Sequence, residues 1–217
     1  LLTMVSPSPP HTVVSEIREK VSRDRAIEFY NKSILIRRQL VKDHPDVPEY
    51  ASSLAGSYYN LANALSELGK TDEAIEFYNK AMLIREQLAK DHPDVPLYAS
   101  GLARSYNNLA IALSELGKTD EAIEFYKKTI AIKEQLVKDH PDVLAYADSL
   151  ALSYNNLANA LSELGKTDEA IEFHNKAMLI RKRLVKDHPD MPLYASGLAR
   201  SYHNLANALS ELGKTDE

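Results

Sequence analysis

The stretch NNLANALSELGKTDEAIEF, from Asn155 to Phe173, decides the fold because it occurs three times in full with few changes, and a fourth time as far as Glu217. Near copies begin at Tyr59, Asn107 and His203, and the glycines within the copies stand at 69, 117, 165 and 213, always 48 residues apart. Residues 51–98 and 99–146 are identical at 36 of 48 positions. Such regular self-similarity predicts an array of stacked units instead of one globule.

Each unit contains two helical patterns, which we call helix A and helix B. Apolar residues of helix A recur three and four positions apart between Pro96 and Leu116, as on one face of an α-helix. Gly117 supplies the backbone freedom that ends helix A, and acidic residues then open helix B. Pro141 ends helix B near Asp139. The residues that helix B is expected to bury are Ala122, Phe125, Tyr126, Ile130, Ile132 and Leu136.

Composition narrows the class of protein and of partner. The chain is 44% apolar, has neither Trp nor Cys, and shows no run with the period-two alternation of a strand. A net charge of −5 argues against nucleic acid, whose binding requires a basic face. The absence of Cys excludes a disulfide framework and fits a cytoplasmic protein. No membrane-spanning or secretory segment is expected, because the apolar start Leu1–Val5 is too short for either.

The pattern of residues resembles the tetratricopeptide repeat family. That family's order of a large aromatic, Leu-Gly, large, Ala, aromatic and Ala corresponds here to Tyr106, Leu109-Ala110, Leu113, Ala122, Tyr126 and Thr129, and to the equivalent residues 48 positions away on either side. Ala replaces the family's Gly, Thr129 replaces an Ala, and His174 replaces an aromatic residue. The resemblance covers residues 24–217 and implies an all-α, right-handed superhelical solenoid of antiparallel helix pairs.

The unit is longer than the family's 34 residues. The extra residues divide equally between the end of helix B and the start of helix A, and lengthen each helix by about two turns. Added whole turns keep the core face in place. The ending IREQLAKDHPDV is similar to the long repeats of kinesin light chains. The domains expected from these boundaries are a proline-rich tail 1–12 and one solenoid 13–217, comprising a half repeat 13–45, repeats 46–93, 94–141 and 142–189, and a terminal helix A 190–213.

Stacked units create a shared concave face, which the resemblance assigns to the A helices. Three lines of positions on helix A vary between units, and between them one Asn never changes. A column of amides at repeat spacing can form hydrogen bonds with successive peptide groups of an extended chain. In similar helical-repeat proteins such an asparagine ladder binds a peptide backbone. The alternative is that water or a neighbouring helix satisfies the hydrogen bonds of these amides. Two arginines in the variable lines fit carboxylate recognition, or are simply solvated charges. The candidate peptide-binding residues are Asn60, Asn63, Asn108, Asn156, Asn159, Asn204, Asn207, Arg104, Arg200, Tyr59, Asn107, Asn155 and His203, and the remaining variable positions are Gly56, Leu152 and Ile111.

Other recurring residues are read as structural. Tyr50 and its equivalents at 98, 146 and 194 favour the core over a stacking platform. The four His residues of the Asp-His-Pro-Asp turns lie a repeat apart, too far to share a metal ion. Gly-Lys-Thr lacks the preceding Gly and the strand of a phosphate loop. We therefore expect no enzyme, no cofactor and no metal.

These observations predict a non-enzymatic scaffold that binds an extended protein segment along the concave face of the A helices. Two alternatives remain: a structural or self-associating spacer, and the regulatory or sensor arm of a larger multidomain enzyme. Near the end of the sequence, Leu205, Leu209 and Leu212 have no following helix B in this sequence to cover them. This predicts either a longer chain or a homo-oligomer that pairs or swaps its terminal helices.

Overall fold

The protein is described here by a computed structural model that covers residues 11–215, with the side chains of residues 21–213. Most of the predicted tail 1–12 lies outside the described residues. Residues 11–215 contain only helices and their connecting turns, without a strand. The helices are α1 (His11–Asp43), α2 (Pro48–Glu67), α3 (Thr71–Asp91), α4 (Pro96–Glu115), α5 (Thr119–Asp139), α6 (Leu144–Glu163), α7 (Thr167–Asp187) and α8 (Pro192–Thr215).

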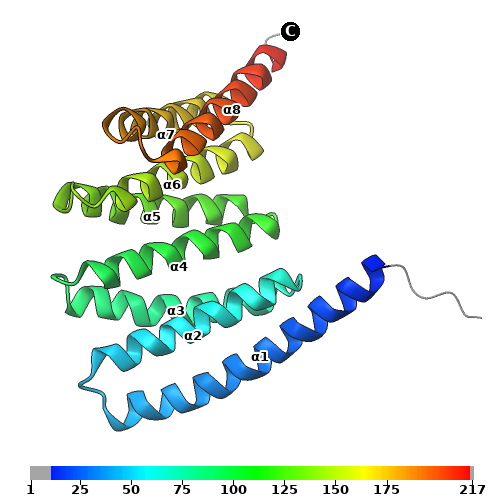
Figure 1. The fold of residues 1–217 in the computed structure, drawn as a ribbon, viewed down its shortest axis with the longest axis vertical. Coiled ribbons are helices and arrows are strands. Elements are labelled where there is room, and N and C mark those ends of the chain that lie inside the picture. The colour runs from blue at the N-terminus through cyan, green and yellow to red at the C-terminus, as the bar shows by residue number, and fades with distance from the viewer. Residues whose placement is uncertain (1–10, 216–217) are drawn as a thin grey trace, which may run out of the picture.

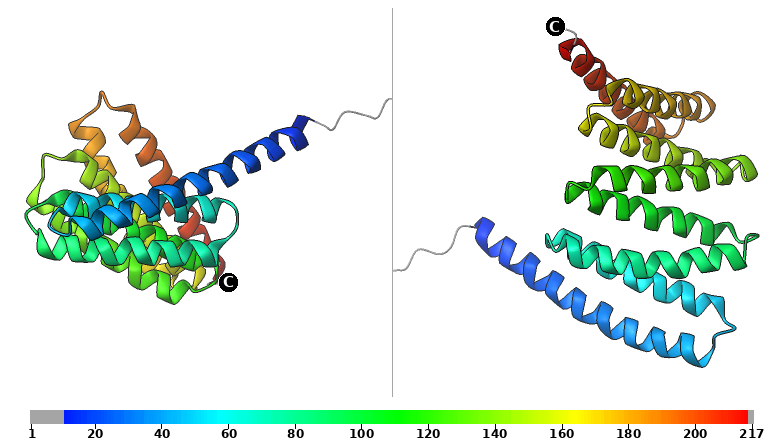
Figure 2. Two further views of the ribbon diagram at one scale, coloured as in Figure 1. Left: turned by 90° about the horizontal axis from the view of Figure 1, so that it is seen from below. Right: turned by 180° about the vertical axis from the view of Figure 1, so that it is seen from behind.

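Each helix packs against the next one along the chain. Helices α2, α4, α6 and α8 are the predicted A helices, and α3, α5 and α7, together with the second half of α1, are the predicted B helices. Figure 1 shows them as successive layers, with α1 at one end of the stack and α8 at the other. The views from below and from behind show the same succession (Figure 2). The predicted all-α solenoid of antiparallel helix pairs is confirmed.

The turn between helix A and helix B has the same geometry in three units. In the central unit, the N–H of Lys118 donates to the carbonyl of Leu113 at 2.9 Å, and the N–H of Gly117 donates to the carbonyl of Ser114 at 2.9 Å. Gly117 has a φ of 73°, which glycine adopts without strain. This pair of bonds is the Schellman motif, and it satisfies carbonyls that the helix end would leave free.

We expect Gly117→Ala to lower the free energy of unfolding by about 1 to 2 kcal/mol, because a side chain disfavours the left-handed backbone. An added Cβ meets nothing within 4 Å at Gly117, so the loss comes from conformation alone. Gly56→Ala is the matched control, since Gly56 has equally open surroundings without a positive φ, inside helix α2. It should be neutral or stabilise the protein. Urea unfolding measures the stability of both variants. Equal losses of stability would contradict the role assigned to the positive φ of Gly117.

The turn between helix B and the next helix A is built on the Asp-His-Pro-Asp residues. The N–H of His92 donates to the carbonyl of Leu88 at 3.0 Å, and the carbonyl of His92 accepts from the N–H of Val95 at 3.1 Å. The ring of His92 packs on that of Tyr98, with centroids 5.6 Å apart, and the other three His–Tyr pairs repeat this contact. Tyr98 and Tyr194 are buried, as predicted for core residues, whereas Tyr50 and Tyr146 are half-buried.

Small residues let the helices of a pair approach closely. Ala110 and Ala122, from facing helices α4 and α5, are both 0% exposed, and Leu109 beside them is 2% exposed. The same residue types fill the cores of the neighbouring units. Of the residues that helix B was expected to bury, Ala122, Tyr126, Ile130 and Leu136 are buried, and Phe125 and Ile132 are half-buried.

The two ends of the chain depart from the pattern of the inner units. Helix α1 runs unbroken from His11 to Asp43, where an inner unit has two helices separated by a turn. Val21 stands where Gly69 turns the chain one unit later, so the helix continues. At the other end, α8 runs through Gly213 to Thr215, past the position where the other three copies turn.

Candidate functional site

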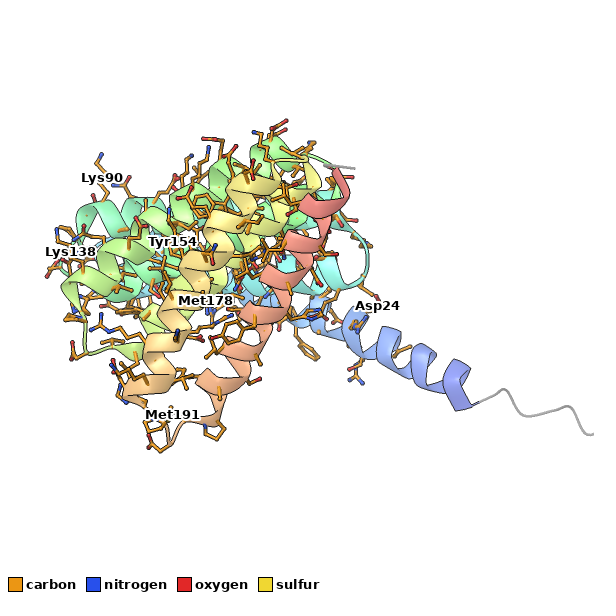
Figure 3. All side chains as sticks on the ribbon, turned by 90° about the horizontal axis from the view of Figure 1, so that it is seen from above. Asp24, Lys90, Lys138, Tyr154, Met178 and Met191 are labelled. Atoms are coloured by element: carbon orange, nitrogen blue, oxygen red, sulfur yellow. The ribbon has the colours of Figure 1, made fainter. Side chains whose placement is uncertain are left out.

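The A helices form the inner wall of the stack. Close backbone approaches between neighbouring units occur along this side, where α2 meets α4 and α6 meets α8. Layers that are closer on one side curve towards it, so the A side is the concave one. Three hollows follow one another along this wall. Away from it, Lys90 and Lys138 project from the ends of helices α3 and α5, whereas Tyr154 lies among the packed helices (Figure 3).

The first hollow has a volume of about 380 Å³ and carries positive charge. We call it the cationic hollow. It is bounded by α4 and α6, with Arg104 on one side and Lys133 reaching in from α5. Arg104 is exposed, and so is Leu152 on the opposite wall. The complete lining is Tyr59, Leu97, Ser100, Gly101, Arg104, Asn107, Asn108, Lys133, Ser149 and Leu152.

Tyr59 forms the floor of the cationic hollow. The guanidinium carbon of Arg104 lies 4.7 Å from the centre of the Tyr59 ring, and that of Arg85 lies 5.0 Å from it. The ring therefore attracts two guanidinium groups, an arrangement that fixes the position of Arg104. The hydroxyl of Tyr59 also accepts a hydrogen bond of 2.8 Å from the amide of Asn108. Tyr59 is itself only 9% exposed, so it supports the site from below.

The B helices contribute a basic residue at the same position in every unit, and sequence reasoning missed it. Arg85 donates to the carbonyl of Gly101 at 3.1 Å and to the hydroxyl of Ser105 at 2.6 Å, both on the next helix A. Lys133 makes the same two bonds to Ser149 and Ser153, at 3.0 and 2.8 Å. Each cation thus clamps one unit to the next. We call this set, Arg37, Arg85, Lys133 and Arg181, the cation column.

A signal for the cation column exists in the sequence. Its members are 48 residues apart, and Arg85 interrupts an otherwise apolar stripe formed by Ala81 and Leu88. A charge that recurs on a buried face needs fixed partners. The recurring Ser one unit further on, at 57, 105, 153 and 201, is that partner, and all four Ser residues are at most 1% exposed.

Burial lowers the pKa of three members of the cation column, Arg85, Lys133 and Arg181. Burial lowers the pKa of Arg85 to about 10. Burial also lowers the pKa of Lys133 to about 8, although the carboxylate of Asp148 opposes the shift. Arg181 is 0% exposed and has a lowered pKa for the same reason, with Asp148 at 3.3 Å as its counter-charge. Asp148 thus lies between two cations, where the other units have Ser.

The Lys133 pKa predicts how stability changes with pH. Above about pH 8 the folded protein releases this proton while the unfolded chain holds it up to 10.5, so stability rises with pH across that interval. Lys133→Arg keeps the charge at all these pH values. From about pH 7 to about pH 9.5, the wild type should gain about 2 kcal/mol of unfolding free energy relative to this variant. Urea unfolding at each pH measures the difference. If the stabilities of the two proteins change in parallel with pH, the lowered pKa of Lys133 is contradicted.

The predicted asparagine ladder is partly engaged within the protein. Asn108 donates to Tyr59 and, at 3.2 Å, to Asn63, which also accepts from the hydroxyl of Tyr78 at 2.6 Å. Asn156 donates to Asn107 at 3.0 Å. These bonds tie neighbouring A helices together, which is the alternative role that the sequence left open. Among the described side chains, the amides of Asn60, Asn159 and Asn204 have no such partner in the protein.

The remaining predicted peptide-binding residues differ in how far they are exposed. Asn155 is 3% exposed and accepts from Nδ1 of His174 at 2.8 Å, so it belongs to the core. Burial lowers the pKa of His174. Arg200 is exposed, and His203 and Asn207 are exposed and bonded to each other at 3.3 Å. The structure therefore brings Arg104, Tyr59, Asn107 and Asn108 into one hollow and leaves the α8 residues outside it.

The second and third hollows carry negative charge. They have volumes of about 320 and 310 Å³ and lie towards the ends of the A helices. Glu115 and Glu163 line the second hollow, and Glu163 and Glu211 line the third. Asn159 is shared by both. The concave wall is therefore positive near the middle of the A helices and negative near their carboxyl ends, so it favours one orientation of a charged ligand.

Two sequence models described as tetratricopeptide repeat match the chain, one over residues 53–135 and 101–155, the other over residues 150–190 and 198–217. The chain belongs to the tetratricopeptide repeat family. It is a tandem-repeat scaffold for protein–protein interaction. A search of curated protein sequences gives no match.

Solved structures share the fold. A Podosopora anserina protein described as a kinesin light chain, with nearly identical TPR-like repeats, gives a TM-score of 0.64 at 23% identity over 94% of this chain and 85% of that chain. A single-substitution variant of that protein gives 0.60 at 23% identity, over 94% and 90%. The apo form of RapI gives 0.60 at 16% identity, over 86% of this chain and 45% of that chain. At such identities the likeness concerns the fold alone.

Two further properties bear on the class of site. No helix within residues 11–215 is both long and apolar enough to cross a membrane. Among the described side chains, no three His, Asp or Glu residues gather where they would hold a metal ion.

Proposed function

We propose that this chain is a non-enzymatic, cytoplasmic scaffold that binds an extended peptide segment along the concave face of its A helices. The observation that carries the proposal is the cationic hollow, in which Arg104 and Lys133 face the exposed side chain of Leu152 across about 380 Å³. A hollow with convergent polar groups and an apolar wall is the usual form of a ligand site.

The hollow suits a carboxylate beside an apolar side chain. The Arg104 guanidinium is planar and suits a carboxylate in a two-bond contact, and its position over Tyr59 reduces the entropy lost on binding. Lys133 already donates to Ser149 and Ser153, so it contributes charge more than a new hydrogen bond. Leu152 offers apolar contact. The ligand class is therefore a segment in which an acidic residue stands next to an aliphatic or aromatic one.

The acidic hollows define the direction of the ligand. Basic residues of the segment are expected near Glu115 and Glu163, on the side away from Arg104. The free amide of Asn159 lies between the two acidic hollows and is available to a peptide group. The amides of Asn108 and Asn156 bond to neighbouring A helices, so Asn60, Asn159 and Asn204 contact the peptide backbone instead.

Selection of random displayed peptides on the immobilised chain tests this proposal. We expect enriched sequences with a carboxylate next to an apolar residue, and affinity that falls as salt rises. A photo-crosslinking amino acid at Leu152 should capture the selected peptides. The same substitution at Leu179, which is 59% exposed on helix α7, is the matched control and should not. Capture at Leu179 in place of Leu152 would overturn the proposed face.

A further inference from the structure

Helix α8 exposes a face that is buried in its internal counterpart. Residues 192–211 are identical to residues 96–115 of helix α4 at 18 of 20 positions. Leu113 of α4 is 4% exposed and Tyr106 is 7% exposed, whereas the equivalent Leu209 is 51% and Tyr202 is 48% exposed. The exposed face of α8 therefore consists of the same residues that are buried in α4.

Internal units show what covers such a face. Helix α5 packs on α4, and the ring of Phe125 lies 5.7 Å from that of Tyr106. The corresponding Tyr–Phe pairs of the other two hairpins have centroid distances of 6.0 and 5.8 Å. A helix B with Phe at this position is thus the natural cover of a helix A with this sequence.

The second half of α1 is a helix B, and no separate helix A precedes it among the described residues. Residues 24–43 are identical to residues 72–91 of helix α3 at 15 of 20 positions. Phe29, the equivalent of Phe77, is 58% exposed. Tyr30 is half-buried, whereas the equivalent Tyr78 is 3% exposed. Among the described residues α1 packs against α2, which covers only one side of it.

The two uncovered faces cannot meet within one molecule. Helices α1 and α8 lie at opposite ends of the stack (Figures 1 and 2). Both helices also run past the position of an internal turn, α1 back to His11 and α8 on to Thr215, so their backbones allow uninterrupted antiparallel packing. A second copy of this chain offers each of the two faces, with the sequence of the internal cover.

We propose that copies of this chain associate head to tail, with α8 of one copy packed against α1 of the next in the manner of an internal A–B hairpin. Tyr202 then contacts Phe29 of the second copy, and Leu209 becomes buried. Such a contact joins two different surfaces, so it leaves a free α1 at one end and a free α8 at the other and extends into a fibre. This surface is separate from the cationic hollow between α4 and α6.

Sedimentation velocity over a concentration series tests the junction with two variants. Leu209→Asp disables the α8 face, and Phe29→Asp disables the α1 face. The wild type should increase in mass with concentration, and each variant alone should remain monomeric. A mixture of the two should form dimers and nothing larger, because the intact α1 of one variant meets the intact α8 of the other.

The outcomes separate the alternatives. A wild type that remains monomeric at the highest soluble concentration would overturn the proposal. Self-association of either variant alone would overturn it too, since this means that like faces pair. Leu179→Asp is the control for an added charge on an exposed Leu, and it should associate as the wild type does. Circular dichroism confirms that all variants are folded.

Peptide capture at Leu152 distinguishes this junction from the proposed groove. The Leu209→Asp variant should still bind peptides selected on the wild type, and loss of the groove should leave the mass increase unchanged. Failure of one proposal therefore does not imply failure of the other.

Discussion

Replacing Arg181 by Ala is expected to lower the free energy of unfolding by about 3 to 5 kcal/mol. Arg181 is 0% exposed and clamps α7 to α8 through the carbonyl of Gly197 at 3.1 Å and the hydroxyl of Ser201 at 3.0 Å. Its loss leaves both acceptors without their donor, removes one of the two cations beside the Asp148 carboxylate, and opens a cavity. Urea unfolding measures the change.

The effect should be greatest at α8. Hydrogen exchange is expected to show that the amides of α8 lose protection before those of α4, because α8 packs mainly on α7. Arg183→Ala is the matched control: its side chain is 85% exposed and pairs only with Asp187, four residues away on the same helix. We expect a change within about 0.5 kcal/mol there. Equal losses for both variants would show that burial of Arg181 contributes nothing.

Arg104→Glu is expected to weaken binding of the selected acidic peptides about 100-fold or more, equivalent to about 2.8 kcal/mol. The change removes the guanidinium that faces the cationic hollow and puts a like charge against the ligand carboxylate. Because Arg104 is exposed, the fold should be unaffected. Isothermal titration with one selected peptide measures the affinity.

Arg183→Glu is the control for net charge. It alters the total charge equally but lies on α7, on an exposed helix surface away from the hollow. Its affinity should stay within about threefold of the wild type. If both variants weaken binding to the same extent, the attraction is a long-range property of the whole chain and Arg104 has no special position.

Periodicity made most of the fold predictable. The 48-residue spacing, the apolar face of residues 96–116 and the Gly-Lys-Thr turns led to helices α2 to α8, with bounds within a few residues. This succeeded because the signals are local: amphipathic spacing, Gly at a positive φ, and Pro at a helix start each depend on a few neighbours in sequence. The family followed from the same residues.

The site was less predictable, because it depends on contacts between units. Sequence variation identified Arg104, Asn107 and Tyr59, which do line one hollow. The sequence did not show that the amide of Asn108 donates hydrogen bonds to Tyr59 and Asn63, which stand 49 and 45 residues earlier. Nor did it find the cation column, whose partners lie 16 and 20 residues ahead on the next helix.

The sequence by itself determined the repeating unit, its two helices and the faces that they bury, because those properties follow from local periodicity. The tertiary structure alone decided which contacts each copy of a repeated residue makes. Asn60 and Asn108 stand at equivalent positions, but Asn108 donates to Tyr59 and Asn63, whereas Asn60 has no such partner among the described side chains. The physical reason is that a bonded amide or a buried charge is stabilised by its neighbours in space, which belong to other units.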